Sequence, residues 1–232
     1  LCFQIRTKKA AAPAVSRSTS RPPGIFMEAT LNDTRPDIVP CWSCGGPIDG
    51  SAFCDTCKAV QPPGQRDHFS RLGLNVSFDI DPATLDEVYF SMQRKLHPDR
   101  FATHSPKEKA YSQQQATAIN DAYETLKDPH GRADYMVHLK GTDVLPEGCN
   151  LINDQVLLIE SMEMREALAE SETPADVDII SARATEDIRV CIAQLSKLFA
   201  NNDIEGACKL TTRLKYLKKL AQEAQAHRAK LI

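Results

Sequence analysis

The tripeptide His97-Pro98-Asp99 is one of two sets of residues in this chain whose side chains could do chemistry. A histidine and a carboxylate this close could serve as a general acid–base pair if a pocket and a nucleophile lay within hydrogen-bond reach. No serine or cysteine motif lies nearby, and a loop tip supplies no pocket. A chance tripeptide in an ordinary turn is the plain alternative. The basic neighbours Arg94, Lys95 and Arg100 favour a recognition loop that acts on another protein.

Four of the eight cysteines form a second candidate site. They make two Cys-x-x-Cys pairs, Cys41 with Cys44 and Cys54 with Cys57, separated by nine residues. This spacing lets four thiolates converge on one tetrahedral Zn²⁺ and predicts a closed, structural zinc site. Paired disulfides and bound iron are the alternatives. A segment of about 17 residues cannot build an apolar core, so the metal would supply its folding free energy. The other cysteines are interpreted as free thiols, and helical spacing places Cys208 off the core stripe of its helix. They are Cys2, Cys149, Cys191 and Cys208.

Two amphipathic helices are expected to position the tripeptide. Asp81-Pro82 predicts the start of the first, since Asp81 can cap and proline fits the first helical position. Pro98 predicts its end near His97. A capping box at Ser105-Pro106-Lys107-Glu108 then opens a second helix that runs to Pro129. The face of the first helix that should be buried comprises Leu85, Val88, Tyr89, Met92 and Leu96.

Composition limits the class of protein. The 232 residues are 42% hydrophobic and 25% charged, which is ordinary for a globular chain with one or two small domains. No apolar run approaches the ~20 residues that a bilayer-spanning helix needs. A formal net charge of −3 argues against nucleic acid as the main partner. A zinc-dependent nucleic-acid module is therefore disfavoured, and an electron carrier with iron at the four cysteines is the other alternative.

The N-terminal residues 1–27 differ from the rest of the chain. They contain five basic side chains, no acidic ones, and much alanine and serine. This is the composition of a mitochondrial targeting segment, with a disordered basic tail as the alternative. Without those five charges the formal charge of the remainder falls from −3 to −8. The basic residues are Arg6, Lys8, Lys9, Arg17 and Arg21.

The C-terminal part is expected to form three helices. The first starts near Asn153 or Asp154 and runs to about Ser171, the second covers 174–200, and the third runs from about Asp203 to the end. Short connections favour antiparallel neighbours and hence a small bundle. Together with the earlier helices, this pattern predicts an all-α chain preceded by the small four-cysteine zinc module.

The first of these three helices carries more apolar surface than a bundle needs. Leu157, Met164 and Leu168 make a sufficient core stripe at 100° per residue. A second apolar face has a rim of carboxylates, which is the usual form of a protein-docking surface. Packing of that face against another part of the chain is an equal alternative from periodicity alone. The second face comprises Leu158, Ile159, Met162, Glu163, Glu166 and Glu170, and Tyr216 beside Lys215 lies off the core stripe of the last helix.

The region from Asp67 to Gly141 resembles the J domain of DnaJ-type co-chaperones. The resemblance rests on residues 96–101 around the tripeptide, on 119–127 and on 132–136. Within that superfamily the chain is similar to the HscB family of iron–sulfur cluster co-chaperones, because the match continues through the last eighty residues. The four-cysteine segment is typical of the animal or plant mitochondrial form of this family.

The resemblance implies residue roles. In HscB-like proteins the iron–sulfur scaffold docks on the C-terminal bundle, so scaffold contacts are expected from the second apolar face and from Lys215 and Tyr216. Met162 stands where a leucine is common, and Lys215-Tyr216 where Arg-Phe can occur, which bears on affinity more than on role. The loop, with Arg94, Lys95 and Arg100, would dock on an ATP-bound DnaK-type heat-shock chaperone and stimulate its ATP hydrolysis.

These expectations divide the chain into a mitochondrial segment (1–27), a linker (28–40), a zinc module (41–57), a J domain (67–141) and a scaffold-binding three-helix bundle (151–232). The protein is expected to be a non-enzymatic co-chaperone of the mitochondrial matrix, and a cytosolic pool and a homodimer are left open. No nucleic acid or membrane is expected as a partner.

Overall fold

The computed structural model describes residues 39–141 and 155–231, which lie within one compact unit, 36–232. The expectations for residues 1–38 and 142–154 fall outside this part. The elements are β1 (Val39–Pro40), β2 (Pro47–Ile48), α1 (His68–Arg71), α2 (Pro82–Leu96), the 3₁₀ turn η1 (Pro98–Phe101), α3 (Pro106–Lys127), α4 (Pro129–Gly141), α5 (Gln155–Ala169), α6 (Pro174–Ala200) and α7 (Ile204–Arg228). The all-α fold class is confirmed, since the strands form only a two-residue antiparallel ribbon.

Several helices start at a proline directly after a capping side chain. Asp81 accepts a hydrogen bond from the N–H of Thr84, and Ser105 and Thr173 form capping boxes with the residues three places on. Proline fits this first position because its missing N–H would have no helical partner there. These starts agree with the sequence analysis.

Helix α4 is an element that the sequence analysis did not assign. Pro129 ends α3, as expected, but it also opens α4, because Asp128 accepts a hydrogen bond of 3.0 Å from the N–H of Gly131. This is the same Asp-Pro signal that opens α2. The sequence analysis predicted only that Pro129 ends α3.

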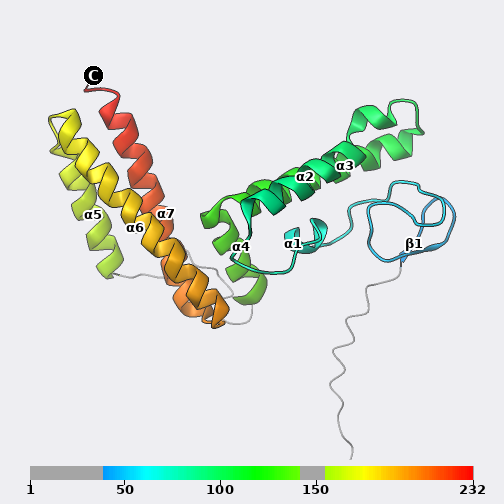
Figure 1. The fold of residues 1–232 in the computed structure, drawn as a ribbon, viewed down its shortest axis with the longest axis horizontal. Helices are drawn as coiled ribbons and strands as arrows, with labels where there is room; N and C mark the ends of the chain where they lie inside the picture. The colour runs from blue at the N-terminus through cyan, green and yellow to red at the C-terminus, as the bar shows by residue number, and fades with distance from the viewer. Residues whose placement is uncertain (1–38, 142–154, 232) are drawn as a thin grey trace, which may run out of the picture. The chain divides into compact units, whose positions relative to one another are not determined.

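The helices pack in two groups, α1–α4 and α5–α7 (Figure 1). Helices α2 and α3 lie side by side as a hairpin, and α6 and α7 form the most extensive helix pair, with α5 against both. None of the described helices is long and apolar enough to cross a membrane. The predicted core residues Leu157, Met164 and Leu168 are all buried in α5.

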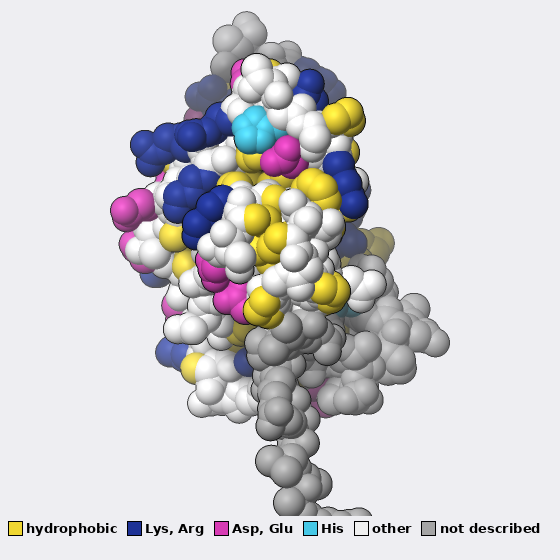
Figure 2. All heavy atoms as spheres, turned by 90° about the vertical axis from the view of Figure 1, so that its right-hand side faces the viewer, with side chains coloured by type: hydrophobic (Ala, Val, Ile, Leu, Met, Phe, Trp, Pro, Cys, Tyr) yellow, Lys and Arg dark blue, Asp and Glu magenta, His cyan; other side chains and the backbone are white. Residues whose placement is uncertain are grey.

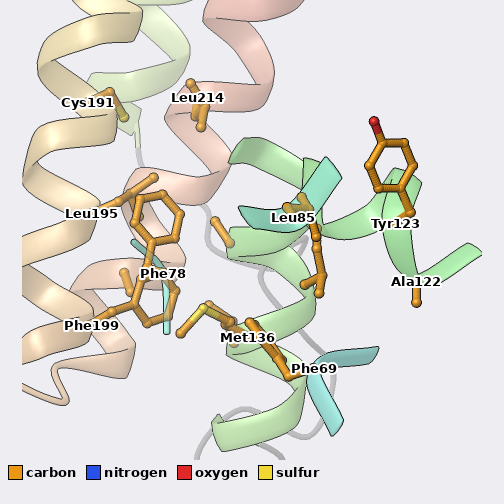
Figure 3. Close-up of a cluster of buried hydrophobic side chains, with 14 of the residues drawn as sticks. Phe69, Phe78, Leu85, Ala122, Tyr123, Met136, Cys191, Leu195, Phe199 and Leu214 are labelled. Atoms are coloured by element: carbon orange, nitrogen blue, oxygen red, sulfur yellow. The ribbon is translucent and has the colours of Figure 1, made fainter. Parts of the chain in front are cut away.

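One apolar core runs through both groups (Figure 3). The ring of Phe78, from the segment before α2, stacks on Phe199 of α6 with ring centroids 5.2 Å apart, and Met136 of α4 lies beside them. The buried guanidinium of Arg132 lies 5.1 Å from the centroid of the Phe78 ring. A hydrogen bond adds to this contact, since the Ser196 hydroxyl donates to the Asp79 carboxylate at 2.6 Å.

The interpretation of Cys208 was wrong in two ways. Its side chain is fully buried in α7, although helical periodicity placed it off the core stripe, and it is disulfide-bonded instead of free. Chain spacing does not report which sulfurs tertiary packing brings within bonding distance. Cys191 is free, as expected, and buried beside α7, where burial raises the pKa of its thiol to about 11.

Asp128 offers a test of this packing, because it caps α4 and also pairs with Lys218 of α7. Asp128→Ala should lower the free energy of unfolding by about 1–2 kcal/mol at pH 7, since both interactions are lost. Asp128→Asn, which can still cap, should lose less, and Lys218→Met should lose only the ion pair. Urea unfolding followed by circular dichroism measures all three.

The pH dependence of Asp128 has a defined sign. Burial raises the pKa of this carboxyl, but the Lys218 ammonium and the Gly131 N–H lower it more, so the net pKa lies below the usual value. The ionic contribution is thus complete above about pH 4 and is lost as the pH falls through the lowered pKa. The stability gap between the parent chain and Asp128→Asn should narrow from pH 7 to pH 3; a constant gap would contradict the ion pair.

Candidate functional site

The four cysteines of the second candidate site converge. All four sulfur atoms lie within 4.8 Å of one another, and the Cys41–Cys57 and Cys44–Cys54 sulfurs are each 3.7 Å apart. A tetrahedron with metal–sulfur bonds of about 2.3 Å has sulfur–sulfur edges of about 3.8 Å. Disulfides are excluded for these four residues, which are free thiols. The residues therefore fit one tetrahedral metal ion.

Two tight backbone turns bring the sulfurs together. The N–H of Gly45 donates to the carbonyl of Cys41 at 2.9 Å, and that of Lys58 donates to the carbonyl of Cys54 at 2.8 Å. Gly45 has a φ of +73°, and a side chain on Gly46 would meet the Thr56 hydroxyl at 3.1 Å. Glycine therefore suits both positions after the first cysteine pair.

The electrostatics of the thiols also suit a cation. Burial raises the pKa of Cys41, but the N–H groups of Cys44 and Ser43 and the neighbouring thiols lower it by more. The net pKa is about 6. The Gly46 N–H lowers the pKa of Cys44, yet the side chains of Cys57 and its other neighbours raise it to about 12. Four thiolates this close repel one another, and a divalent cation would offset that repulsion.

The tripeptide, the first candidate site, forms an exposed turn between α2 and α3. The side chains of His97 and Asp99 are 53% and 90% exposed, and His97 Nδ1 lies 3.6 Å from the Asp99 carboxylate. His97 Nδ1 also accepts a hydrogen bond of 3.3 Å from the N–H of Asp99. The pair faces solvent with no nucleophile beside it among the described residues. The pair therefore lacks the enclosed surroundings that acid–base catalysis needs.

Pro98 leaves two carbonyl groups of α2 without helical partners, and both are satisfied locally. Pro98 has no N–H to donate to the carbonyl of Arg94, and the Arg100 guanidinium donates to it instead at 3.2 Å. The carbonyl of Leu96 accepts a buried hydrogen bond of 2.7 Å from the Ser112 hydroxyl of α3. Arg100, expected only as a contact residue, thus also caps α2.

Basic and apolar side chains surround the turn (Figure 2). Arg94, Lys95 and Arg100 are exposed there, as expected. Basic side chains gather beside hydrophobic ones on the face that includes this end of the hairpin. Phe90, 55% exposed, lines a shallow hollow together with Gln93, Arg94 and His97. The sequence analysis missed Phe90, although an aromatic residue on the polar face one turn before Arg94 was a usable signal.

The second apolar face of α5 is exposed in the structure. Leu158, Ile159 and Met162 are 38%, 56% and 68% exposed, so they are not core residues of this fold. The rim residues Glu163, Glu166 and Glu170 are exposed beside them. Val156, 76% exposed and one turn before Ile159, extends this face and was missed.

Helix α7 borders this face. Tyr216 is partly buried and lines a small pocket between α5 and α7 with Leu157 and Met164, while Lys215 is exposed. Arg213 of α7 forms an ion pair of 2.6 Å with Glu160 of α5. The second apolar face and the Lys215-Tyr216 pair, which the sequence analysis expected to act together, thus lie on adjoining helices.

Comparison with known proteins agrees with both halves of the fold. A family model described as the HscB C-terminal oligomerisation domain matches residues 153–225, and the DnaJ domain model matches residues 67–135. The iron–sulfur cluster co-chaperone protein HscB of mouse is 33% identical over 196 residues, covering 82% of this chain and 83% of the relative. The human protein of the same name is 36% identical over 188 residues, covering 79% and 80%.

A solved structure has a similar fold. The crystal structure of the human co-chaperone protein HscB superposes with a TM-score of 0.75 at 35% identity, covering 81% of this chain and 98% of that one. The resemblance inferred from the residues around the tripeptide and from the C-terminal helices is confirmed. The chain belongs to the HscB family of J-domain co-chaperones.

Proposed function

We propose that this chain is a co-chaperone of iron–sulfur cluster biogenesis that joins two partner proteins and holds no catalytic group of its own. The observation that carries the proposal is the presence of two separate exposed surfaces on one folded unit. One is the His97-Pro98-Asp99 turn with its basic neighbours, and the other is the apolar face of α5 with its carboxylate rim. The names of the mouse and human relatives supply the process.

The turn docks on a mitochondrial DnaK-type heat-shock chaperone in its ATP-bound state. Arg94, Lys95 and Arg100 favour an acidic surface on that partner and speed the encounter, while Phe90 adds apolar contact. A turn fixed at both ends pays little conformational entropy on binding. Docking favours the chaperone state that hydrolyses ATP.

The scaffold on which clusters are assembled binds the second surface. Leu158, Ile159 and Met162 supply an apolar centre, and Glu163, Glu166 and Glu170 supply a charged rim, as in protein interfaces generally. Lys215 and Tyr216 contribute from α7. Binding both partners at once presents the scaffold to the chaperone as its client, so that the cluster is released to acceptor proteins.

The four cysteines hold a structural zinc ion in this proposal. Thiolate ligands and a tetrahedral arrangement suit Zn²⁺, and four protein ligands leave no open position for a substrate. The zinc would stabilise the segment around it and take no part in the reaction of the partners.

The place of action is the mitochondrial matrix. The basic, acid-free composition of residues 1–27 supports this assignment. The match to a family model described as an oligomerisation domain leaves a homodimer as a second form of the chain.

The proposal is tested by single-turnover ATP hydrolysis with a mitochondrial DnaK-type chaperone. The cluster scaffold and this chain are added separately and together. Stimulation greater than the sum of the separate effects is expected, because each partner's binding is coupled to the other's conformational state. No stimulation by the folded, metal-loaded chain would overturn the proposal.

His97→Gln should reduce stimulation of the ATPase by more than about tenfold, because a contact that orders the chaperone is lost. Binding of the scaffold, measured by calorimetry, should not change. His104→Gln is the matched control, since it alters another exposed histidine just beyond the turn. Loss of both activities together in His97→Gln would contradict the separation of the two surfaces.

Leu158→Ala combined with Met162→Ala should weaken scaffold binding by about tenfold to a hundredfold, because both side chains lie in the centre of the proposed interface. The melting temperature should barely change, since both are exposed. Ile179→Ala, on an exposed apolar residue of α6, is the control and should bind normally. A large fall in stability would instead make Leu158 and Met162 structural residues.

Metal analysis of the purified chain should give one zinc per chain and no visible absorption, whereas iron bound by thiolates would be coloured. Cys44→Ser combined with Cys57→Ser should remove the metal, because two of four ligands are lost. Cys191→Ala, at a free cysteine outside the cluster, should retain it. Iron in stoichiometric amount would replace zinc in the proposal and revive the electron-carrier alternative.

A further inference from the structure

The four-cysteine segment is packed into the first helix group and is not a separate body. Val60, just beyond the last cysteine, is fully buried in the same core cluster as Leu96 and Ile119 of α2 and α3. Arg66 donates hydrogen bonds both to the carbonyl of Gly50 in the segment and to that of Ser70 in α1, the latter at 2.8 Å.

The segment rests on the first turns of α3. Trp42, between the first two metal-ligating cysteines, packs edge-on against Tyr111 with centroids 5.7 Å apart. The Lys107 ammonium lies 4.5 Å from the centroid of the Trp42 ring, a cation–π contact. The Trp42 indole N–H donates to the carbonyl of Val60 at 2.7 Å, which fixes the ring in this position.

Two buried glutamines continue the connection from the metal site into α3. Gln61 Nε2 donates to the Cys41 sulfur at 3.3 Å and to the Ala59 carbonyl at 2.8 Å. The main-chain carbonyl of Gln61 accepts a bond of 2.9 Å from the side-chain amide of Gln115 in α3. Both side chains are 4% exposed, so losing either bond would leave a buried polar group unpaired.

The same part of α3 holds the turn. Ser112, one turn before Gln115, donates to the carbonyl of Leu96, the residue before His97. Ser112 therefore holds the chain just before the tripeptide. After the tripeptide the chain leads into the first turn of α3, which bears Lys107. Every step from the Cys41 sulfur to His97 is a direct bond or a main-chain connection within α3 or the loop.

The segment depends on metal to keep this geometry. Its own buried cluster contains three residues, Cys41, Ile48 and Cys54, and two of these are metal ligands. A cluster this small cannot order the segment by itself, so the metal ion must act together with the contacts to α3. Release of the ion would free Trp42 and Gln61 together and leave the Gln115 amide without its partner.

We propose that the metal-loaded four-cysteine segment positions the His97-Pro98-Asp99 turn, through Gln61, Gln115 and Ser112 acting as positioning residues, so that metal occupancy controls how well the turn is presented. The part of this inference that concerns partner binding rests on the proposed docking of the turn on a chaperone. The positioning of the turn by the metal-loaded segment does not depend on any partner.

The first test is hydrogen exchange of the full chain, loaded with zinc and after zinc removal by a chelator. Amides of residues 97–116 should exchange about tenfold faster without zinc, because the first turns of α3 and the loop open more often. Amides of α6 should not change, which shows that the rest of the chain stays folded. Fluorescence of Trp42, the single tryptophan, should shift to the red, and added zinc should reverse both effects. Faster exchange confined to residues 39–60 would overturn the inference.

The second test separates positioning from metal binding. Gln115→Ala should retain its zinc yet show the faster exchange of residues 97–116, and Gln114→Ala is the matched control, an exposed glutamine one position earlier on the same helix. Equal exchange in the two variants would overturn the inference. A global loss of protection in Gln115→Ala would show as faster exchange in α6 as well, and the zinc-removal experiment then decides the matter.

The chaperone assay gives a third readout. Zinc removal and Gln115→Ala should each raise the concentration of this chain that gives half-maximal ATPase stimulation, by about tenfold, and leave the maximal stimulation and scaffold binding unchanged. An unchanged half-maximal concentration would overturn control of presentation by the metal. Absence of stimulation by the zinc-loaded parent chain would count against the proposed function alone, because the exchange experiments do not involve a chaperone.

Discussion

The hydrogen bond from Ser112 to the carbonyl of Leu96 is the interaction on which the presentation of the tripeptide depends. Pro98 must end α2, since its ring and its missing N–H both break the helix. The broken helix leaves carbonyls without helical partners, and a buried one costs free energy unless a donor reaches it. Ser112 is that donor for Leu96. The second carbonyl, that of Arg94, takes its bond from Arg100, so the turn after the proline also completes the helix before it.

This constraint explains why an exposed turn can be stiff. Only Phe101 of η1 is buried, and it anchors the turn while His97 and Asp99 remain in water. A recognition element benefits from such an arrangement, because a turn that is already ordered loses little entropy on binding. The second exposed surface, on α5, is held differently. Leu157, Met164 and Leu168 fix the helix from beneath and ion pairs join it to α7, so its other face stays exposed.

Much of this could be predicted from the sequence because the relevant signals are local. Asp81-Pro82 and Ser105-Pro106 specify helix starts by hydrogen bonds within one turn, and the core stripe of α5 follows from helical spacing. The cysteine spacing likewise brings two pairs of ligands together by short turns. The signals for Phe90 and for the second role of Pro129 are local as well.

The remaining features depend on residues far apart in the sequence. The burial of Cys208 depends on which helices pack against α7, and the helical period of the sequence does not specify that. Gln61 and Gln115 are 54 positions apart, and glutamine has no strong preference for the interior, so nothing in either neighbourhood predicts a buried bond between them. The stacking of Phe78 on Phe199 is likewise not predicted by any local signal, because the two residues are far apart in the sequence.

The size of the four-cysteine segment gives these long-range contacts their importance. A segment with three buried residues of its own must take stability from a metal ion, from a neighbour, or from both. Here it uses both, since Val60 enters the core beside α2 and α3 while Cys41 contributes to the metal site and accepts a bond from Gln61. When two sources of stability share residues in this way, a change in one must alter the other, because the free energy of metal binding includes the free energy of ordering the contacts. The coupling between the cysteine cluster and α3 is thus a consequence of how little core the segment has.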